Sequence, residues 1–165
     1  MSPISATTDP CRASVARTAS SGLLYLDTSA AAKIVMDEPE SSALATELAR
    51  WPDAATSALT RVELPRAIAR RRHLDPRVQV DESLLFGFFA ATIELPLSNE
   101  VLDAAATVPP PTLRALDAIH LASALTLGED LAAVVTYDTR MFDAAERPQM
   151  PTLQPGHQAS GDRGA

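Results

Sequence analysis

Cysteine and long apolar runs are both scarce in this chain of 165 residues. Its single cysteine, Cys11, excludes an internal disulfide framework and any metal site built from several cysteines. The longest apolar run, 84–93, is about half the ~18 residues that a membrane span requires. The N-terminus also lacks the apolar segment of a signal peptide. We therefore expect a cytoplasmic protein that does not act at a membrane.

Lysine is equally scarce, because Lys33 is the one lysine among 14 basic residues and the others are arginine. Against 21 acidic residues this leaves a net charge of −7 and an isoelectric point near 4.9. That balance argues against a protein that coats nucleic acid through its overall field. It remains compatible with an enzyme that gathers carboxylates around a metal and keeps its arginines on one face. The arginine bias reflects either a GC-rich genome or phosphate recognition, for which the guanidinium group is suited.

Apolar residues are plentiful enough for one core, at 46% of the chain, although only 4% are aromatic. Residues 1–22 are rich in serine, alanine and threonine without apolar periodicity, and they predict a disordered leader or a start codon placed too far upstream. Residues 23–155 predict a single domain, and 156–165 predict a flexible tail.

Strand-like and helix-like segments alternate within that domain. Short apolar runs predict strands at Leu23–Leu26, 54–56, Thr92–Leu95, 132–137 and 151–153. Helical spacing predicts helices at 29–36, 41–49, 58–72, 78–91, 99–106, 113–127 and 139–146. The alternation predicts an α/β fold with helices on both faces of a parallel sheet. Ligands in such sheets bind beyond the carboxyl ends of the strands, where the strand order switches.

Four acids stand out by their context. Asp27 follows the first predicted strand in LLYLDTSA, and Asp138 follows the late strand in AVVTYDTR. Glu63 lies early in the helix of SALTRVELPRA, and Asp117 lies among apolar residues in LRALDAIHLASAL. An Asp after a strand is also a common helix cap, and a Glu on a helix is usually solvated. An Asp inside an apolar helix, however, costs stability unless something pairs with it.

Only a folded sheet can gather acids that lie so far apart in the sequence. Grouped carboxylates raise one another's pKa unless a cation lies among them. Oxygen ligands without cysteine or paired histidine favour Mg²⁺ or Mn²⁺ over zinc. Such an ion activates water and stabilises the transition state of phosphodiester cleavage.

The motifs LDTSA, SALTRVEL, LRALDAIHLASAL and VVTYDTRM, in this order, resemble those of the PIN-domain ribonucleases, and specifically of the VapC toxins of bacterial toxin–antitoxin pairs. The resemblance covers about 23–155. It implies a PIN-like three-layer α/β/α sandwich around a short, mainly parallel sheet. It also implies an endoribonuclease that depends on Mg²⁺ or Mn²⁺, forms a homodimer and is neutralised by a cognate VapB-type antitoxin.

The same resemblance assigns roles to the acids. It implies that the catalytic set comprises Asp27, Glu63, Asp117 and Asp138. Asp27, Asp117 and Asp138 would bind the metal, and Glu63 would orient or deprotonate the attacking water. Hydroxyl groups that the family uses to bond a carboxylate or a phosphate match Ser29, Thr136 and Thr139. A hydroxyl after a strand is also a common helix cap.

Basic side chains near the acids are candidates for contacts with RNA. The arginines expected to make them are Arg61, Arg66, Arg70 and Arg140. Arg66 and Arg70 share a helix face because they are four residues apart. A solvated helix surface would account for the same residues.

Three further features leave alternatives open. His120 lies three residues after Asp117 and is either a ligand or general base or, as we expect, a buried histidine that bonds backbone or sheet. The apolar run 84–89 predicts core together with a dimer or antitoxin surface. Pro65 predicts a kink in the helix that carries Glu63, unless that helix begins late enough to place it in the first turn.

Two other classes of protein share some of these features. A catalytically silent PIN-like module would bind RNA or a protein, but the presence of all four acids argues against it. A phosphotransfer enzyme of the haloacid dehalogenase type requires a second Asp where Ser29 stands. The chain also lacks the glycine-rich GxGxxG and GKS/T phosphate loops, which argues against nucleotide binding of that kind.

Overall fold

The computed structural model describes residues 21–145 and 149–157. The predicted leader therefore lies outside the described residues except for 21 and 22. The predicted tail does so except for 156 and 157, and the last residue of the helix predicted at 139–146 lies outside as well.

Five strands form one sheet in the order β3-β2-β1-β4-β5, and every pair of neighbouring strands is parallel. The strands are β1 (Leu23–Leu26), β2 (Asp53–Ser57), β3 (Thr92–Leu95), β4 (Leu131–Val135) and β5 (Thr152–Leu153). The chain adds β2 and β3 on one side of β1 and then crosses to the other side with β4. The strand order consequently switches between β1 and β4.

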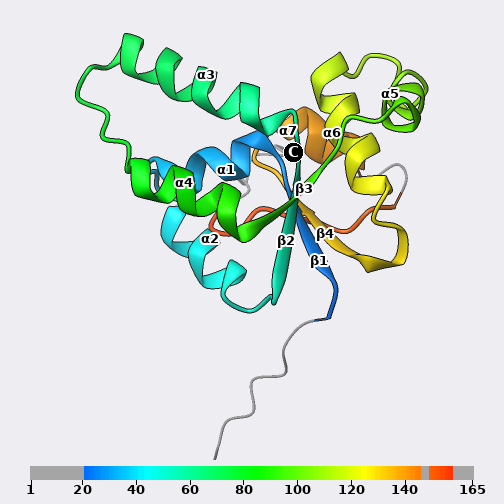
Figure 1. Cartoon of the computed structure of the whole chain (residues 1–165), viewed down its shortest axis with the longest axis horizontal. Helices are drawn as coiled ribbons and strands as arrows, with labels where there is room; N and C mark the ends of the chain where they lie inside the picture. Colours follow the sequence, from blue (N-terminus) through cyan, green and yellow to red (C-terminus); the bar gives the residue numbers. More distant parts are fainter. Residues whose placement is uncertain (1–20, 146–148, 158–165) are drawn as a thin grey trace, which may run out of the picture.

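Helices connect the strands along the described chain (Figure 1). They are α1 (Thr28–Val35), α2 (Ser41–Leu48), α3 (Thr60–Leu74), α4 (Glu82–Ala91), α5 (Asn99–Ala105), α6 (Ala115–Leu125), the short 3₁₀ helix η1 (Gly128–Asp130) and α7 (Thr139–Ala145). The α/β fold that the sequence predicts is confirmed.

Two separate apolar cores lie on the two faces of the sheet. Leu24 and Leu26 of β1 pack on one face with residues of α1, α2, α3 and α4. Tyr25 points to the opposite face and packs with residues of α6 and α7. Side chains alternate in this way because successive residues of a strand point to opposite faces. The arrangement is the expected three-layer sandwich.

The helix α3 begins at Thr60 and continues through Pro65 to Leu74. Pro65 thus lies inside the helix and not in its first turn. At this position a proline removes one backbone hydrogen bond of the helix. Only Thr60, Leu64 and Ile68 are buried, since they lie four residues apart on one stripe. Glu63 and Ala67 are half-buried, and the other residues of α3 are exposed.

The apolar run after residue 81 forms α4, which starts later than the predicted helix because Asp81 caps it by accepting from the N–H groups of Ser83 and Leu84. Phe88 is buried, whereas Phe86 is 77% exposed. The run therefore contributes to the core and also leaves apolar surface uncovered. Among the helices described, none is long and apolar enough to cross a membrane.

Candidate active site

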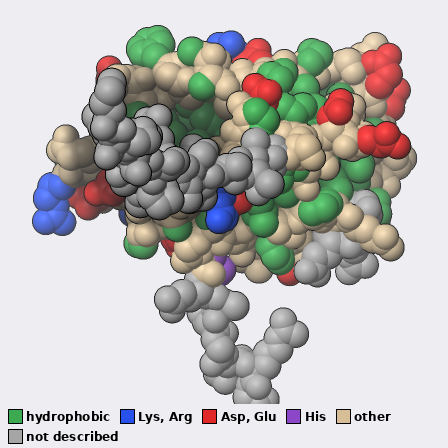
Figure 2. Space-filling model, turned by 90° about the horizontal axis from the view of Figure 1, so that it is seen from below, with side chains coloured by type: hydrophobic (Ala, Val, Ile, Leu, Met, Phe, Trp, Pro, Cys, Tyr) green, Lys and Arg blue, Asp and Glu red, His purple; other side chains and the backbone are tan. Residues whose placement is uncertain are grey.

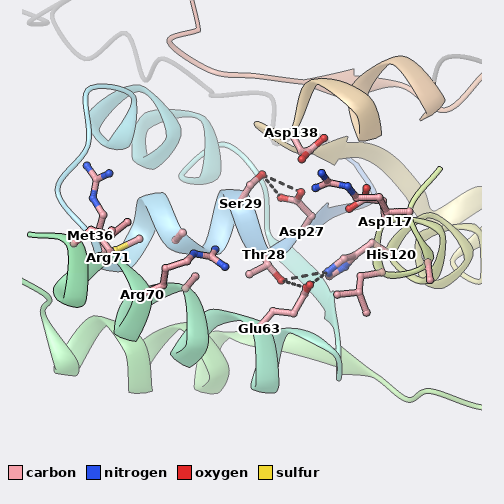
Figure 3. A pocket seen from close by; sticks show the side chains of 16 residues that line it. Asp27, Thr28, Ser29, Met36, Glu63, Arg70, Arg71, Asp117, His120 and Asp138 are labelled. Carbon is pink, nitrogen blue, oxygen red and sulfur yellow. Dashed lines mark hydrogen bonds and ion pairs between the residues drawn. The ribbon is translucent and has the colours of Figure 1, made fainter. Parts of the chain in front are cut away.

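A cleft of about 600 Å³ lies at the carboxyl ends of β1 and β4, where the strand order switches. This is the position at which parallel α/β sheets bind their ligands. The lining includes the four acids singled out from the sequence, which are Asp27, Glu63, Asp117 and Asp138 (Figure 3). They come from four separate segments of the chain, two of them after strands and two on helices, so the fold alone brings them together.

Asp27 follows β1 and is 4% exposed. Its Oδ1 accepts a hydrogen bond from the N–H of Ala30 at 2.8 Å, so Asp27 caps α1 while its carboxylate lines the cleft. Asp27 is therefore both the cap of α1 and a residue of the cleft. Burial raises the pKa of Asp27 above its usual value, although His120 and several hydrogen bonds act in the opposite direction.

Two of the predicted hydroxyl groups hold that carboxylate. Ser29 Oγ donates to Asp27 at 2.7 Å, and Thr136 Oγ1 donates to Oδ2 of Asp27 at 2.7 Å. Each hydroxyl also accepts a backbone N–H, Ser29 from Tyr137 at 2.7 Å and Thr136 from Asp138 at 3.1 Å. The ends of β1 and β4 are therefore joined through the carboxylate.

The third candidate hydroxyl belongs to Thr139, the first residue of α7. Its side chain is exposed, and within the described ranges it donates to none of the four acids.

Asp117 lies in the first turn of α6, because the helix begins at Ala115 and Arg114 is still extended with ψ 147°. The expectation of an acid in the interior of a helix over 113–127 is therefore wrong. In the first turn the helix dipole favours a carboxylate. Even so, Oδ2 of Asp117 is buried and has no hydrogen-bond partner in the part of the chain that the structure describes. Burial and the nearby charge of Asp138 raise the pKa of Asp117.

Asp138 follows β4 by three residues and caps α7. Its Oδ1 accepts the backbone N–H groups of Arg140 at 2.8 Å and Met141 at 3.2 Å. Oδ2 takes no part in either bond. The side chain lies near those of Asp27 and Asp117 in the cleft (Figure 3).

Glu63 lies on the other side of the cleft, on α3. Its Oε2 accepts from Thr28 Oγ1 at 2.6 Å and lies 2.8 Å from Nε2 of His120 (Figure 3). Burial alone would raise the pKa of Glu63, but the hydrogen bonds from His120 and Thr28 outweigh burial and lower it. Glu63 is therefore ionised at neutral pH.

His120 is 3% exposed and bonds the side chain of Tyr25 in β1, as expected of a buried histidine that bonds the sheet. Its contacts with the side chains of Glu63 and Thr28 were not expected. Spacing alone carried the signal, since His120 lies one turn after Asp117 and faces the same cleft. Thr28 and Tyr25 had no signal in the sequence.

Three arginines line the cleft. They are Arg70 and Arg71 from α3 and Arg114 from the start of α6. Arg70 is close enough to lower the pKa of Glu63, and Arg114 acts against the raised pKa of Asp117. The cleft therefore has positive charge on both sides of the acids.

The other candidate arginines lie elsewhere. Arg61 forms an ion pair with Glu94 and stacks over the ring of Phe89. Arg140 lines a separate pocket of about 190 Å³ beside Pro110, and Arg66 is exposed without lining the cleft. The structure thus brings one of the four predicted arginines, Arg70, to the acids, together with Arg71 and Arg114, which were not among the four.

The donor set suits a hard divalent cation. All four acids offer oxygen ligands, which Mg²⁺ and Mn²⁺ prefer. The partnerless Oδ2 of Asp117 is costly unless a cation compensates it. Within 21–145 and 149–157, however, no three acidic, histidine or cysteine side chains are gathered closely enough to hold a metal ion as they stand. The acids therefore share one cleft but lie too far apart to coordinate a single ion in this arrangement.

Comparisons with known proteins agree with this geometry. The family model described as PIN domain matches residues 24–147, which is most of the chain. The chain therefore belongs to the PIN-domain family. Within it, the chain is 41% identical over 138 residues to Ribonuclease VapC47 of Mycobacterium tuberculosis, covering 81% of this chain and 98% of that protein.

Two further relatives come from the same organism. Ribonuclease VapC35 is 43% identical, over 81% of this chain and 98% of its own length, and Ribonuclease VapC46 is 40% identical, over 80% and 97%. The chain thus groups with the VapC proteins. A solved structure of FitAB bound to an IR36 DNA fragment has a TM-score of 0.54 at 19% identity, covering 84% of this chain and 99% of that one, and supports the fold.

Proposed function

We propose that this chain is the toxin of a type II toxin–antitoxin pair, an endoribonuclease that depends on Mg²⁺ or Mn²⁺ and hydrolyses RNA phosphodiester bonds in the cytoplasm. The observation that carries the proposal is the gathering of four acids from four separate segments of the chain at the switch point of the sheet. The identity of 40–43% to ribonucleases named VapC supports it.

Three of the acids, Asp27, Asp117 and Asp138, would hold the cation. When bound, the ion supplies positive charge that lowers the pKa of a water molecule and stabilises the phosphate in the transition state. The chain's own contribution is to hold the ligands in place. Asp27 is fixed by Ser29 and Thr136, so its carboxylate does not need to reorganise.

Glu63 orients the attacking water and accepts its proton. It suits this role because it is ionised and because two hydrogen bonds to Oε2 restrain it. Its Oε1 takes part in neither bond, and Glu63 lines the same cleft as the metal ligands. A positioned carboxylate base contributes about 10²–10⁴-fold to a rate.

The arginines of the cleft bind the RNA backbone. Arg70, Arg71 and Arg114 flank the acids and offer the planar donors that bind phosphate oxygens in pairs. Their placement resolves the conflict between a net charge of −7 and a polyanionic substrate, because the attraction is local. On the face seen in Figure 2, the atoms that are not grey include many apolar and acidic side chains and few basic ones.

The exposed apolar surface of α4 belongs to the interface with a partner. Phe86 and Leu84 are exposed there, and a groove of about 310 Å³ lies between α4, Trp51 and the start of β2. Exposed apolar surface of this kind marks interaction sites. The partners proposed are a second copy of the chain, giving a homodimer, and a VapB-type antitoxin.

A catalytically silent PIN-like module that binds RNA or a protein is the second candidate. The specific observation in its favour is that the described acids do not yet enclose a metal site. The hydrogen bonds around Asp27 would then serve only to cap α1 and to join the ends of β1 and β4.

The deciding experiment incubates total cellular RNA with the purified protein in Mg²⁺, in Mn²⁺ and in EDTA, and maps the cut ends by sequencing. Asp27→Asn is purified alongside, with Asp103→Asn as a control because Asp103 is an exposed acid of α5. Discrete cuts that need metal, persist in Asp103→Asn and vanish in Asp27→Asn establish the ribonuclease. If all three proteins are equally inert in both metals, the binding module is the better description.

A further inference from the structure

A chain of side-chain hydrogen bonds runs from the buried core to the cleft. Tyr25, in the middle of β1, places its hydroxyl 2.7 Å from Nδ1 of His120 on α6. The opposite ring nitrogen, Nε2, lies 2.8 Å from Oε2 of Glu63 on α3. Three elements that are distant in sequence are thus connected through one imidazole ring.

The direction of these bonds follows from the partners. An ionised carboxylate only accepts, so Nε2 of His120 must carry a hydrogen and donate it to Glu63. In the neutral ring Nδ1 then accepts, and the hydroxyl of Tyr25 donates to it. The reverse tautomer would set a nitrogen lone pair against the carboxylate. A protonated ring would still donate through Nε2, so the contact with Glu63 does not depend on the charge of the histidine.

Burial holds the two inner members of this hydrogen-bonded series, Tyr25 and His120, in place. Tyr25 is fully buried and His120 is 3% exposed, so neither ring can leave its place without disrupting the packing around it. Glu63 differs, because its side chain is 22% exposed and reaches the cleft from a helix that is mostly in solvent. A glutamate with three free torsions would otherwise sample many rotamers.

We infer that His120, backed by Tyr25, is a positioning residue that fixes the carboxylate of Glu63 through Oε2 and keeps Oε1 for the cleft. The inference rests on the role of Glu63 in the function proposed above. Thr28 completes the arrangement, since its hydroxyl donates to the same Oε2 at 2.6 Å. Among the described residues, nothing donates a hydrogen bond to Oε1 of Glu63.

Kinetics on one defined RNA substrate at saturating Mg²⁺ separates positioning from packing. Misplacing a catalytic group by about 1 Å costs on the order of a hundredfold in rate. We expect His120→Ala to lower kcat about tenfold to a hundredfold with little change in KM. His120→Gln should recover part of kcat, because its amide nitrogen can donate in place of Nε2. A purely structural role would instead reduce activity only by the fraction that fails to fold, measured by circular dichroism.

The two tyrosines of the chain provide a matched control. Tyr25→Phe removes the hydroxyl that bonds His120 and should lower kcat by about threefold to tenfold, as expected for a lost neutral hydrogen bond. Tyr137→Phe removes a hydroxyl that bonds the carbonyl of Pro155 and should leave kcat unchanged. Equal effects of the two substitutions would overturn the inference.

A spectroscopic measurement tests the hydrogen bonds without any RNA. The ¹⁵N shifts of the His120 ring show which nitrogens carry hydrogen, and Nε2 must be one of them. Glu63→Gln should move the shift of Nε2, and Tyr25→Phe should move that of Nδ1. An Nε2 without hydrogen would overturn the inference even in an active enzyme. An inactive wild type with the expected shifts would instead overturn the proposed function and leave the fixed Glu63 standing.

Discussion

Thr136 donates a hydrogen bond from Oγ1 to Oδ2 of Asp27 at 2.7 Å, across 109 positions of the sequence. The two residues lie at the ends of β4 and β1, which are neighbours only because the strand order switches between them. The bond therefore couples the topology of the sheet to the geometry of the site. A defect in it should be visible in stability and in activity together.

Thr136→Val keeps the shape of this side chain and removes the donor. We expect a loss of about 1–3 kcal/mol in the free energy of unfolding, because a buried carboxylate loses a partner. The hydrogen bond from Thr136 lowers the pKa of Asp27, so its loss raises that pKa further and moves the acid limb of the pH–rate profile to higher pH. Urea unfolding and cleavage rates across pH measure both. Thr139→Val is the control, since Thr139 is exposed; a similar effect there would contradict the prediction.

Asp117→Asn should make the metal-free protein more stable at neutral pH. The folded-state pKa of Asp117 is raised by burial and by Asp138, so the folded protein binds this proton more tightly than the unfolded chain. The stabilisation by the protonated form is present below the unfolded pKa and is lost as pH rises through the folded pKa. Because asparagine does not titrate, the variant avoids this loss of folding stability at neutral pH. In EDTA at pH 7 we expect Tm to rise by about 2–4 °C, with the difference shrinking or reversing near pH 4. Asp103→Asn, a change at an exposed acid, should not show this pattern.

Divalent cations should raise Tm in a concentration-dependent way, because an ion that binds only the folded state stabilises it. At a concentration of about a hundred times the dissociation constant, the gain is about 2.7 kcal/mol. Asp27→Asn and Asp117→Asn should lose this response, while Asp103→Asn retains it. Differential scanning fluorimetry with Mg²⁺ or Mn²⁺, reversed by EDTA, makes the measurement. A full response in Asp117→Asn would remove that residue from the ligand set.

Arg70→Ala and Arg114→Ala should weaken RNA binding without abolishing the chemistry. Both arginines line the cleft, so each loses a phosphate contact and KM rises about tenfold. The slope of log affinity against log salt should become shallower by about 0.7 for each contact with a single strand. Arg50→Ala is the matched control, because Arg50 pairs with Glu47 at the end of α2 and does not line the cleft. A comparable effect of Arg50→Ala would indicate a general loss of positive charge instead.

The local pattern of the sequence was sufficient for the strands and for the acids that follow them. Asp27 could be found because a polar residue directly after a short apolar run marks the end of a buried strand. Asp138 was found by the same pattern, although the strand predicted over 132–137 ends at Val135, three residues before it. The start of α6 could not be found from the sequence. The apolar pattern of LRALDAIHLASAL continues upstream of the residue at which the backbone becomes helical. Asp117 was therefore expected inside a helix and instead lies in its first turn.

The contacts of the arginines could not be predicted from the sequence either. Arg61 and Arg70 belong to one helix and carry the same charge, yet Arg61 pairs with Glu94 and Arg70 lines the cleft. Helical spacing defines their relative angle but not which neighbour each one meets. Glu94 comes from β3, whose place beside β2 depends on the complete sheet.

By itself, the sequence determined the alternation of strands and helices and the α/β class, because apolar periodicity and strand ends are local properties. The roles of the four acids followed from the resemblance of their motifs to those of PIN-domain ribonucleases. Only the tertiary structure decided that Thr28, Tyr25 and His120 converge on Glu63 and that Arg114 joins the cleft. These contacts join residues up to 95 positions apart. They depend on the strand order and on the packing of α6 against the sheet, and no spacing within the chain specifies either.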